Sequence, residues 1–304
     1  MRLLENIDQL IEEAKNNQPL KLAVVAAEDE VVVSSIKKAT NLGIVTPILI
    51  GDKLKIEKIV KEKDLTRQVE IIGTESKNDS AHTAMQLIKD GEADFPMKGH
   101  INTSVILKAL LDKEYGLRGD NILSLVTLIY LEEDNRFVIL TDGGMNISPD
   151  LKDKIDLINN AAQMAHAVGI EKPKTAVLAA VETVNPAMEA TLDAAALSKM
   201  SDRGQLGDVI VDGPLAFDNA ISKKAAEHKG INSPVAGNAD ILLVPDIEAG
   251  NVLYKSLVFY GKQPSASVIV GAKVPLVITS RADSSHTKLN SIALGKVMTE
   301  YNKI

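Results

Sequence analysis

The chain has 304 residues, enough for two domains of ordinary size or for one large domain with a substantial buried core. It contains no cysteine, so disulfide bonds, thiolate metal sites, iron–sulfur clusters and a cysteine nucleophile are excluded. The formal net charge of −7 argues against a nonspecific nucleic-acid binder, because phosphate backbones require a broad positive surface. A small anion can still bind where a few cations converge on one site.

No stretch approaches the run of about eighteen apolar residues that a membrane helix requires. The segment 3–14 interrupts its apolar residues with charges, which predicts an amphipathic helix rather than a signal peptide. We therefore expect no membrane association and a cytoplasmic location. Only 3% of the residues are aromatic, so the core must be built from Ala, Val, Ile and Leu, as is typical of buried parallel strands.

Short apolar runs alternate with longer segments of helical spacing in the first part of the chain. The expected strands are 21–27, 46–51, 69–73 and 93–99, and the expected helices are 29–42, 78–90 and 103–114. This alternation predicts a doubly wound α/β sheet with helices on both faces.

The pattern changes at 122–141, where two apolar runs joined by EEDN predict an antiparallel hairpin or the seam between two domains. The alternation then resumes. The expected strands are 175–180, 207–213, 239–245, 266–271 and 275–279, and the expected helices are 150–168, 187–200, 216–229, 248–260 and 284–302. The last helix could return to the first domain and make that domain discontinuous.

Small polar loops follow several of these strands, and ligands of open α/β sheets bind at such strand ends. The segment 97–104 places Lys98 beside a glycine and Asn102, Thr103 and Ser104 at a helix N-terminus. Free N–H groups and the helix dipole favour an anion there. The alternative is that Asn102 or Thr103 only caps the helix.

A second strand-to-helix junction, at 278–285, contains Ser280, Arg281 and Asp283. The guanidinium of an arginine is a planar fork that suits phosphate or carboxylate. A surface Arg–Asp pair beside serine caps would produce the same pattern and contribute little. From the residues alone, both interpretations stay open.

Two further strand ends carry candidates. Asp212 comes at the end of an expected strand, and Gly213 and Pro214 are expected to turn the chain. Gly250 and Asn251 fall in the first turns of a later helix. The dinucleotide GxGxxG, the P-loop, the HExxH and the GxSxG motifs are absent, and the five histidines are scattered, so no metal site is expected.

Taken in order, these loops resemble those of the phosphate acyltransferase family, and within it the phosphate butyryltransferases. The matching stretches are MKGHINTS at 97–104, LTDGGMNISP at 140–149, and the segments 174–188, 193–231, 233–262 and 268–296. The short motifs within these stretches are weak evidence when taken singly. Their occurrence in the same order over nearly the whole chain is specific to the family.

The resemblance implies an isocitrate/isopropylmalate dehydrogenase-like fold of two doubly wound α/β/α domains with a cleft between them. We expect a discontinuous N-terminal domain of residues 1–127 and 278–304, and a second domain, 128–277, that mediates dimerisation. The implied activity is reversible exchange of a short-chain acyl group between CoA and inorganic phosphate. CoA would act as a substrate, with no tightly bound cofactor, in a homodimer or larger homo-oligomer.

The resemblance also assigns roles to residues. It places Ser280 and Arg281 as catalytic residues that meet CoA and phosphate, and it matches Thr103 to a loop threonine. With a one-residue gap, Lys108 falls where relatives carry a phosphate-binding arginine, so the charge is kept but the fork is lost. The remaining residues expected to bind phosphate or CoA are Lys98, Asn102, Ser104, Asp212, Gly213, Pro214, Gly250 and Asn251.

One departure concerns the base that would deprotonate the CoA thiol. Relatives place an aspartate seven residues after the serine, and this chain has Thr287 there. Asp283 and His286 are the nearby candidates, and we expect Asp283 because SRAD matches the butyryltransferase pattern. Relatives also often carry histidine where this chain has Leu125, so that histidine cannot be essential here.

Two other functions stay open. A metal-dependent dehydrogenase of the same fold would need metal-binding carboxylates and a Lys–Tyr pair, neither of which is evident in the sequence. A non-catalytic CoA-binding protein is compatible with the missing aspartate. For an acyltransferase without cysteine, direct transfer between CoA and phosphate in a ternary complex is the simplest route.

Overall fold

The computed structural model describes residues 2–66, 68–279 and 283–303. The chain divides into two compact units. Unit 1 contains the residues up to Asn6 together with Asn121–Pro264, and unit 2 contains Ile7–Asp120 together with the chain from Ser265 onward. The expected borders, 127/128 and 277/278, fall later in the chain than these. Each unit is therefore discontinuous in sequence.

Within unit 2 the strand order is β3-β2-β1-β4-β11-β10. The strands are β1 (Leu20–Val25), β2 (Val45–Gly51), β3 (Glu70–Gly73), β4 (Phe95–Lys98), β10 (Ser265–Val270) and β11 (Leu276–Val277). The helices are α1 (Ile7–Lys15), α2 (Glu30–Asn41), α3 (Lys53–Glu62), α4 (Lys77–Lys89), α5 (Thr103–Leu110) and α11 (Ser285–Tyr301). All strand pairs are parallel except that of β10 with β11.

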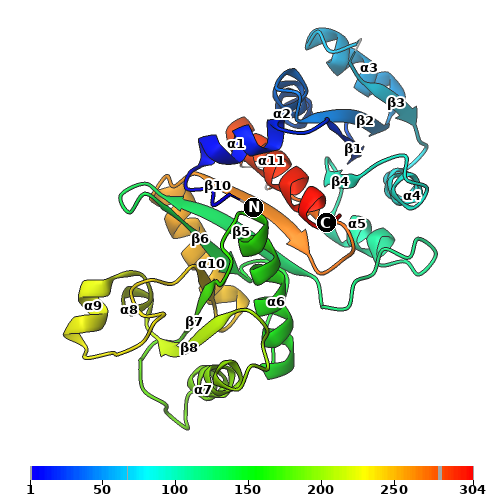
Figure 1. Cartoon of the computed structure of the whole chain (residues 1–304). Coiled ribbons are helices and arrows are strands. Elements are labelled where there is room, and N and C mark those ends of the chain that lie inside the picture. The colour runs from blue at the N-terminus through cyan, green and yellow to red at the C-terminus, as the bar shows by residue number, and fades with distance from the viewer. Residues whose placement is uncertain (1, 67, 280–282, 304) are drawn as a thin grey trace. The chain divides into compact units, whose positions relative to one another are not determined.

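The helices of unit 2 pack on this sheet in two groups. One consists of α1, α2, α3 and α11, and the other of α4 and α5. Figure 1 shows α11, in red, beside α1, in blue, although these helices come from opposite ends of the chain. Local sequence sets the helix ends: Asp29 caps α2 by accepting the Val32 N–H over 2.9 Å. Gly43 follows with a φ of +72°, a left-handed conformation that ends the helix.

Within unit 1 the strand order is β5-β6-β9-β7-β8. The strands are β5 (Ser124–Leu131), β6 (Arg136–Thr141), β7 (Lys174–Leu178), β8 (Ile210–Leu215) and β9 (Ile241–Leu243). The helices are α6 (Leu151–Ala167), α7 (Glu189–Asp202), α8 (Phe217–Ile221), α9 (Lys223–His228), α10 (Ile247–Lys255) and a π-helical turn, Ser256–Tyr260. The antiparallel pairing of β5 with β6 confirms the predicted hairpin.

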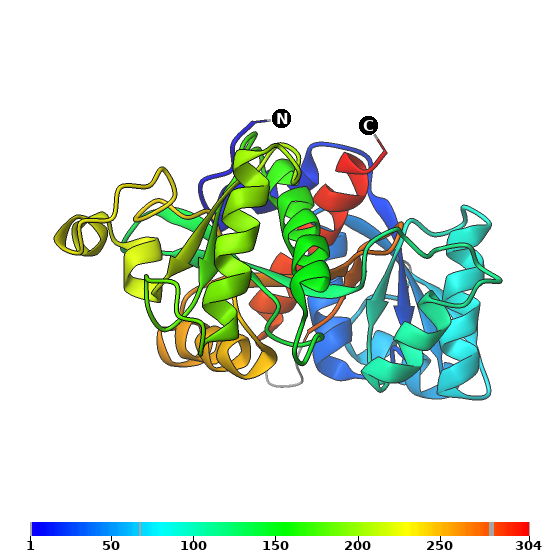
Figure 2. The same ribbon diagram turned by 90° about the horizontal axis from the view of Figure 1, so that it is seen from below.

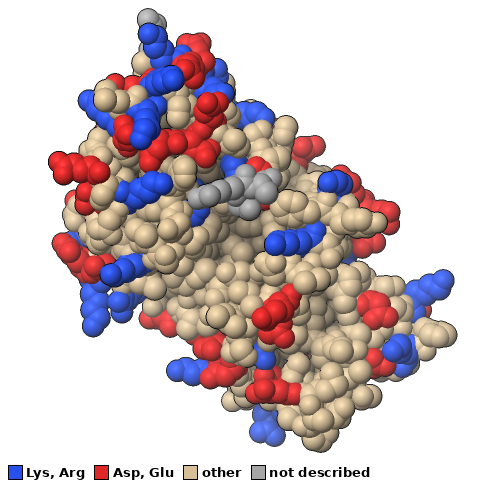
Figure 3. Space-filling model, turned by 180° about the vertical axis from the view of Figure 1, so that it is seen from behind, with Lys and Arg blue, Asp and Glu red and all other residues tan. Residues whose placement is uncertain are grey.

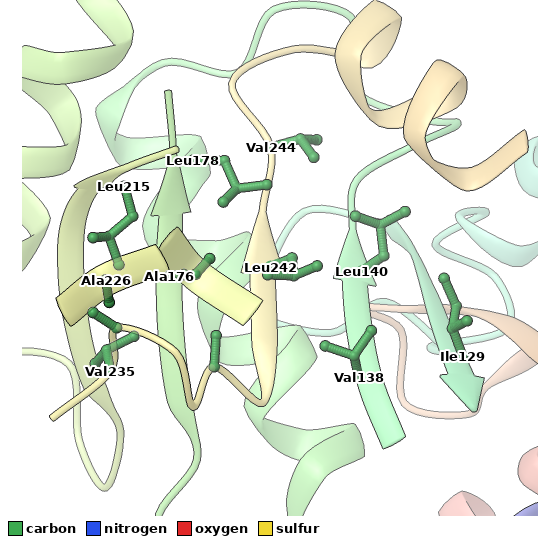
Figure 4. Close-up of a cluster of buried hydrophobic side chains, with 13 residues drawn as sticks. Ile129, Val138, Leu140, Ala176, Leu178, Leu215, Ala226, Val235, Leu242 and Val244 are labelled. Carbon is green, nitrogen blue, oxygen red and sulfur yellow. The ribbon is translucent and has the colours of Figure 1, made fainter. Parts of the chain in front are cut away.

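Two apolar clusters lie on opposite faces of the unit 1 sheet, because successive side chains of a strand point to opposite faces. Along β7, Ala176 and Leu178 join one cluster and Val177 joins the other. Leu242 and Leu243 on β9 divide in the same way. Helices α8, α9 and α10 cover the first cluster, shown in Figure 4, whereas α6 and α7 cover the second and stand side by side in Figure 2.

The α/β class is confirmed, and both units contain mixed pairing, because β5 runs antiparallel to β6 and β10 runs antiparallel to β11. Three predicted helices were wrong in extent, and the one expected over 103–114 already ends at Leu110. The first begins at Ile7 rather than residue 3, and the preceding segment instead donates the Leu4 N–H to Val168 O over 2.9 Å. The helix expected over 216–229 is two short helices, because extended Ser222 ends α8 and caps α9.

Candidate functional site

Three loops and two helices of unit 2 surround a pocket of about 160 Å³. The loops follow β1, β4 and β11, which are neighbouring parallel strands, so their carboxyl ends lie at one edge of the sheet. The helices are α2 and α11. The lining residues are Asp29, Val31, Val32, Lys98, Gly99, His100, Thr279 and Lys288. This is the strand-end location that the sequence predicts for a ligand site.

Gly99 brings the loop after β4 against the chain that follows β1. The Gly99 N–H donates to Val25 O over 2.8 Å, and the His100 N–H donates to Ala26 O over 2.7 Å. A Cβ on Gly99 would lie 2.3 Å from the Ala26 oxygen, a separation that real Cβ atoms do not show. Only glycine therefore allows this wall of the pocket to form.

The segment 97–104, which we expect to bind an anion, contributes three of its residues to the lining of this pocket. Lys98, the last residue of β4, is half-buried and lines the pocket. Asn102 occupies the N-cap of α5, but its side chain makes no capping hydrogen bond, so it does not occupy the N–H groups of the first turn. Thr103 and Ser104 begin that helix. Lys108 is exposed in the last turn of α5 and is not among the pocket-lining residues that the structure describes.

The second expected junction is only partly described. Ser280 and Arg281 lie outside the described residues. Asp283, the preferred base, is buried, with 9% of its surface exposed. His286, the other candidate, is exposed.

Thr287 stands where the family resemblance leads us to expect an aspartate, and here it takes part in a helix cap. Ser284 is the N-cap of α11, and its Oγ accepts the Thr287 N–H over 3.1 Å. The two hydroxyl oxygens are 3.0 Å apart. A hydroxyl in a cap of this kind is a weak acid and a poor base, so Thr287 does not replace the missing carboxylate.

Lys288 is not among the residues expected from the sequence. It is the fourth residue of α11, is 3% exposed, and donates its Nζ to Thr279 Oγ1 over 3.2 Å. Burial lowers the pKa of Lys288 below 10.5, an effect that the carboxylates of Asp283 and Asp29 oppose. The helix dipole disfavours a lysine in a first turn, and that unusual position is the signal in the sequence that points to it.

Asp212, Gly213 and Pro214 lie inside β8 rather than in a turn beyond it, which corrects the expectation from the sequence. Because β8 is the edge strand of unit 1, the missing N–H of Pro214 is tolerated. Asp212 Oδ1 accepts the Ser198 hydroxyl over 3.1 Å and the Gly213 N–H over 2.8 Å. A Cβ on Gly213 would lie 2.7 Å from Val177 O, so these residues have structural roles.

Gly250 and Asn251 lie in α10 and pack against the loop after β6. Asn251 donates its Nδ2 to Gly143 O over 3.1 Å, and a Cβ on Gly250 would lie 2.7 Å from Asp142 O. Both residues therefore fix the helix to that loop. In the strand order, β9 and β7 separate this loop from β8, so the two expected groups of unit 1 are not brought together.

Asp142 organises the loop after β6. It is 2% exposed, and its Oδ1 accepts the N–H groups of Gly144 and Met145 over 2.8 and 3.0 Å. Its Oδ2 accepts the backbone N–H and the Nδ2 of Asn146 over 3.1 and 2.6 Å. Burial raises the pKa of Asp142 above 3.8, while these four hydrogen bonds oppose the rise.

Leu125, at the position where the family resemblance leads us to expect histidine, packs on the same loop. A Cβ on Gly144 would lie 2.6 Å from its Cδ2, so the side chain fills the space beside that glycine. It supplies apolar contact rather than a titratable group.

On the face drawn in Figure 3, Lys and Arg side chains are interspersed with Asp and Glu and form no broad basic surface. Among the described residues, no three His, Asp or Glu side chains are grouped so that they could hold a metal ion. Of the helices in the described parts of the chain, none has both the length and the apolar sequence of a membrane span.

Comparison with known proteins identifies the family of this chain. The family model described as phosphate acetyl/butaryl transferase matches residues 67–295. A phosphate butyryltransferase of Clostridium beijerinckii is 44% identical over 300 residues, which cover 98% of this chain and 99% of the relative. A phosphate acetyltransferase of Thermotoga maritima is also 44% identical over 300 residues, covering 96% of this chain and 99% of that one.

Solved structures agree with these relatives. A branched-chain phosphotransacylase from Enterococcus faecalis superposes with a TM-score of 0.82 at 32% identity, covering 91% of this chain and 99% of that one. A 4-hydroxythreonine-4-phosphate dehydrogenase from Klebsiella pneumoniae, 12% identical with a TM-score of 0.55, shares the fold alone. The dehydrogenase alternative is thus not favoured, and the chain belongs to the phosphate acetyl/butaryl transferase family.

Proposed function

We propose that this protein exchanges a short-chain acyl group between CoA and inorganic phosphate, converting acyl-CoA and phosphate reversibly into acyl phosphate and CoA. The observation that carries this proposal is membership of the family, with relatives named phosphate butyryltransferase and phosphate acetyltransferase matched over nearly their full length. The cation-lined pocket at the carboxyl ends of β1, β4 and β11 supports it, because both substrates are anions.

The proposed phosphate-binding elements are the loop after β4 and the N-terminus of α5. Lys98 supplies positive charge, while the first turn of the helix, at Thr103 and Ser104, offers backbone N–H groups and the positive end of the dipole. Ser280 and Arg281, which the family resemblance makes catalytic, complete the proposed site. Asn102, Lys108, Asp212, Gly213, Pro214, Gly250 and Asn251 stay proposed contacts of phosphate or CoA.

The proposed chemistry is direct attack within a ternary complex. The CoA thiolate attacks the carbonyl carbon of the acyl phosphate, a C–S bond forms, and the C–O bond to phosphate breaks. Positive groups around the departing phosphate stabilise the charge that it gains. Asp283 is the proposed base for the thiol, and its side chain is buried, with 9% of the residue's surface exposed.

Direct attack makes a separate prediction about isotope exchange. Labelled CoA should not enter butyryl-CoA when phosphate is absent, because no acyl-enzyme forms. Exchange in the absence of phosphate would instead indicate a covalent acyl-enzyme on a residue other than cysteine.

The experiment that tests the activity is thiol release from acetyl-, butyryl- and isobutyryl-CoA, each with and without phosphate. We expect release that requires phosphate, and the ranking of the three substrates gives the acyl-chain preference. Phosphate-dependent release eliminates a non-catalytic CoA-binding protein. No release with any of them, together with a change in NADH absorbance on candidate hydroxy-acid substrates, would support the dehydrogenase instead.

We further propose a cytoplasmic homodimer or larger homo-oligomer, with no tightly bound cofactor, in which residues 128–277 form the contact. Several large apolar side chains of that stretch are exposed, and we propose that they contribute to the interface. They are Ile147, Val184, Leu192, Val252, Phe259 and Tyr260. Light scattering of the eluting protein would give a dimer or larger mass, and Tyr260→Glu with Val252→Glu should reduce it.

A further inference from the structure

We infer that Val31 and Val32, in the first turn of α2, form the wall on which the acyl chain of the substrate packs. The preferred acyl group then carries an alkyl chain longer than the methyl of acetyl. This inference rests on the proposed function and deepens it, because it names the part of the unit 2 pocket that selects the acyl group.

The unit 2 pocket has a charged part and an apolar part. Lys98, from β4, and Lys288, from α11, contribute charged side chains. Val31 and Val32 are the only hydrocarbon side chains among the lining residues that the structure describes. An acyl phosphate is divided in the same way, since its phosphoryl group is an anion and its acyl chain is a hydrocarbon. The two valines are therefore the described lining residues that suit the acyl chain.

The two valines differ in exposure although they are consecutive. Val32 is 5% exposed and belongs to the core of unit 2, whereas Val31 is 45% exposed. A single exposed apolar residue is common on a protein surface, and it is the place of Val31 in the pocket that gives it a ligand to contact. Each methylene moved from water onto an apolar wall is worth about fourfold in affinity, so a butyryl chain gains more here than an acetyl group does.

The wall is fixed before any substrate binds. Asp29 caps α2, with its Oδ1 accepting the Val32 N–H over 2.9 Å and its backbone O accepting the Val33 N–H over 3.0 Å. Valine in a helix has one strongly preferred side-chain rotamer. A wall that does not rearrange can discriminate between acyl chains that differ by a methylene or two.

The volume of the pocket limits the acyl chain from the other side. At about 160 Å³, it is smaller than the roughly 300–1,000 Å³ of sites that enclose drug-sized ligands. It therefore suits a short acyl phosphate rather than one with a long fatty chain. The inferred substrate class is an acyl group of about four carbons, straight or branched.

The chain offers a matched control for Val31. Leu54 is the second residue of α3, as Val31 is of α2, and the two helices follow neighbouring parallel strands at the same edge of the sheet. Leu54 is 79% exposed and is not among the described residues that line the pocket. Val31→Thr and Leu54→Thr each replace an exposed apolar side chain with a hydroxyl-bearing one, and only the first changes the wall.

The first measurement is the ratio of kcat/KM for butyryl-CoA to kcat/KM for acetyl-CoA. We expect the wild-type ratio to exceed one, and Val31→Thr to lower it by about threefold or more, because a threonine hydroxyl interrupts the apolar wall. Val31→Ile should keep the wild-type ratio or raise it, and Leu54→Thr should leave it unchanged. A wild-type preference for acetyl-CoA, or a Val31→Thr enzyme with the wild-type ratio, would overturn the inference.

The second measurement does not require acyl transfer. Without CoA, butyryl phosphate should raise the Tm of the wild-type protein more than an equal concentration of acetyl phosphate does. That excess should shrink in Val31→Thr and persist in Leu54→Thr. If Val31→Thr does not fold, Val31→Ala serves in its place. A protein with this excess that transfers no acyl group would overturn only the proposed function, whereas an active protein without it would overturn the inference alone.

Discussion

The side-chain amide of Asn146 donates to the buried carboxylate of Asp142 over 2.6 Å, and the same carboxylate accepts three backbone N–H groups of its own loop. One side chain thus replaces the hydrogen bonds that a regular strand or helix would supply to the segment after β6. The segment is therefore held in one conformation by Asp142, and α10 packs on it through Gly250 and Asn251.

Asp142→Ala should therefore lower the free energy of unfolding by at least about 2 kcal/mol, because several donors in a buried loop lose their charged acceptor. Urea denaturation followed by circular dichroism measures the change. Asp134→Ala, in the exposed turn between β5 and β6, is the control and should stay within about 0.5 kcal/mol of wild type. Equal effects of the two substitutions would contradict the role given to Asp142.

Gly99→Ala should reduce phosphate-dependent thiol release strongly, because the added Cβ, 2.3 Å from the Ala26 oxygen, must displace that carbonyl or move the loop itself. Gly91 provides the comparison: it has a φ of +73° and no atom within 4 Å of an added Cβ. Gly91→Ala should cost about 1 kcal/mol of stability from backbone strain and leave the kinetics unchanged. An active Gly99→Ala enzyme would refute the close approach described here.

Lys154 and Asp193 form an ion pair with an Nζ–Oδ2 distance of 2.5 Å, with side chains only 5% and 15% exposed. Lys154→Met should destabilise unit 1 by about 3 kcal/mol, since it leaves the Asp193 carboxylate buried without its cation. Replacing both partners, as Lys154→Met with Asp193→Leu, should recover part of that loss. The quantity to measure is the coupling free energy of a double-mutant cycle, and a value near zero would contradict the pairing.

The buried side chain of Lys296 should make the free energy of unfolding depend on pH in the alkaline range. Burial lowers its pKa in the folded protein below 10.5, and Glu300 opposes the shift. Between the lowered pKa and 10.5 the unfolded chain binds more protons, so the free energy of unfolding rises with pH in that window. Lys296→Met lacks this contribution. The difference in stability, wild type minus variant, should therefore grow as pH approaches 10.5, and a falling difference would show the opposite shift.

Much of the fold follows from the sequence because the strands that are buried on both faces are continuous apolar runs. β1, with Leu22 to Val25 all buried, is an example. The turn predicted at Gly213 and Pro214 was wrong for a physical reason. A Gly-Pro pair is typical of a turn, but an edge strand tolerates it. Whether a strand lies at an edge depends on tertiary pairing, which the local sequence does not show. The single helix predicted over 216–229 was wrong because one extended residue, Ser222, divides an otherwise helical pattern.

The candidate site was predictable where it depends on strand ends and not where it depends on helix packing. Lys98 ends a recognisable strand and Gly99 follows it, so their place at the carboxyl edge of the sheet could be predicted. Lys288 reaches the same pocket only because α11 packs between β10 and α2, a contact between segments far apart in the chain. Periodicity alone assigns Lys288 to an ordinary helical turn.

The most direct test of the account is phosphorus NMR of the purified protein with butyryl-CoA and inorganic phosphate. We predict that an acyl phosphate resonance appears as inorganic phosphate is consumed, in a one-to-one ratio with free CoA thiol. Release of CoA without acyl phosphate, or no reaction while the protein is folded, would contradict acyl transfer to phosphate as its function.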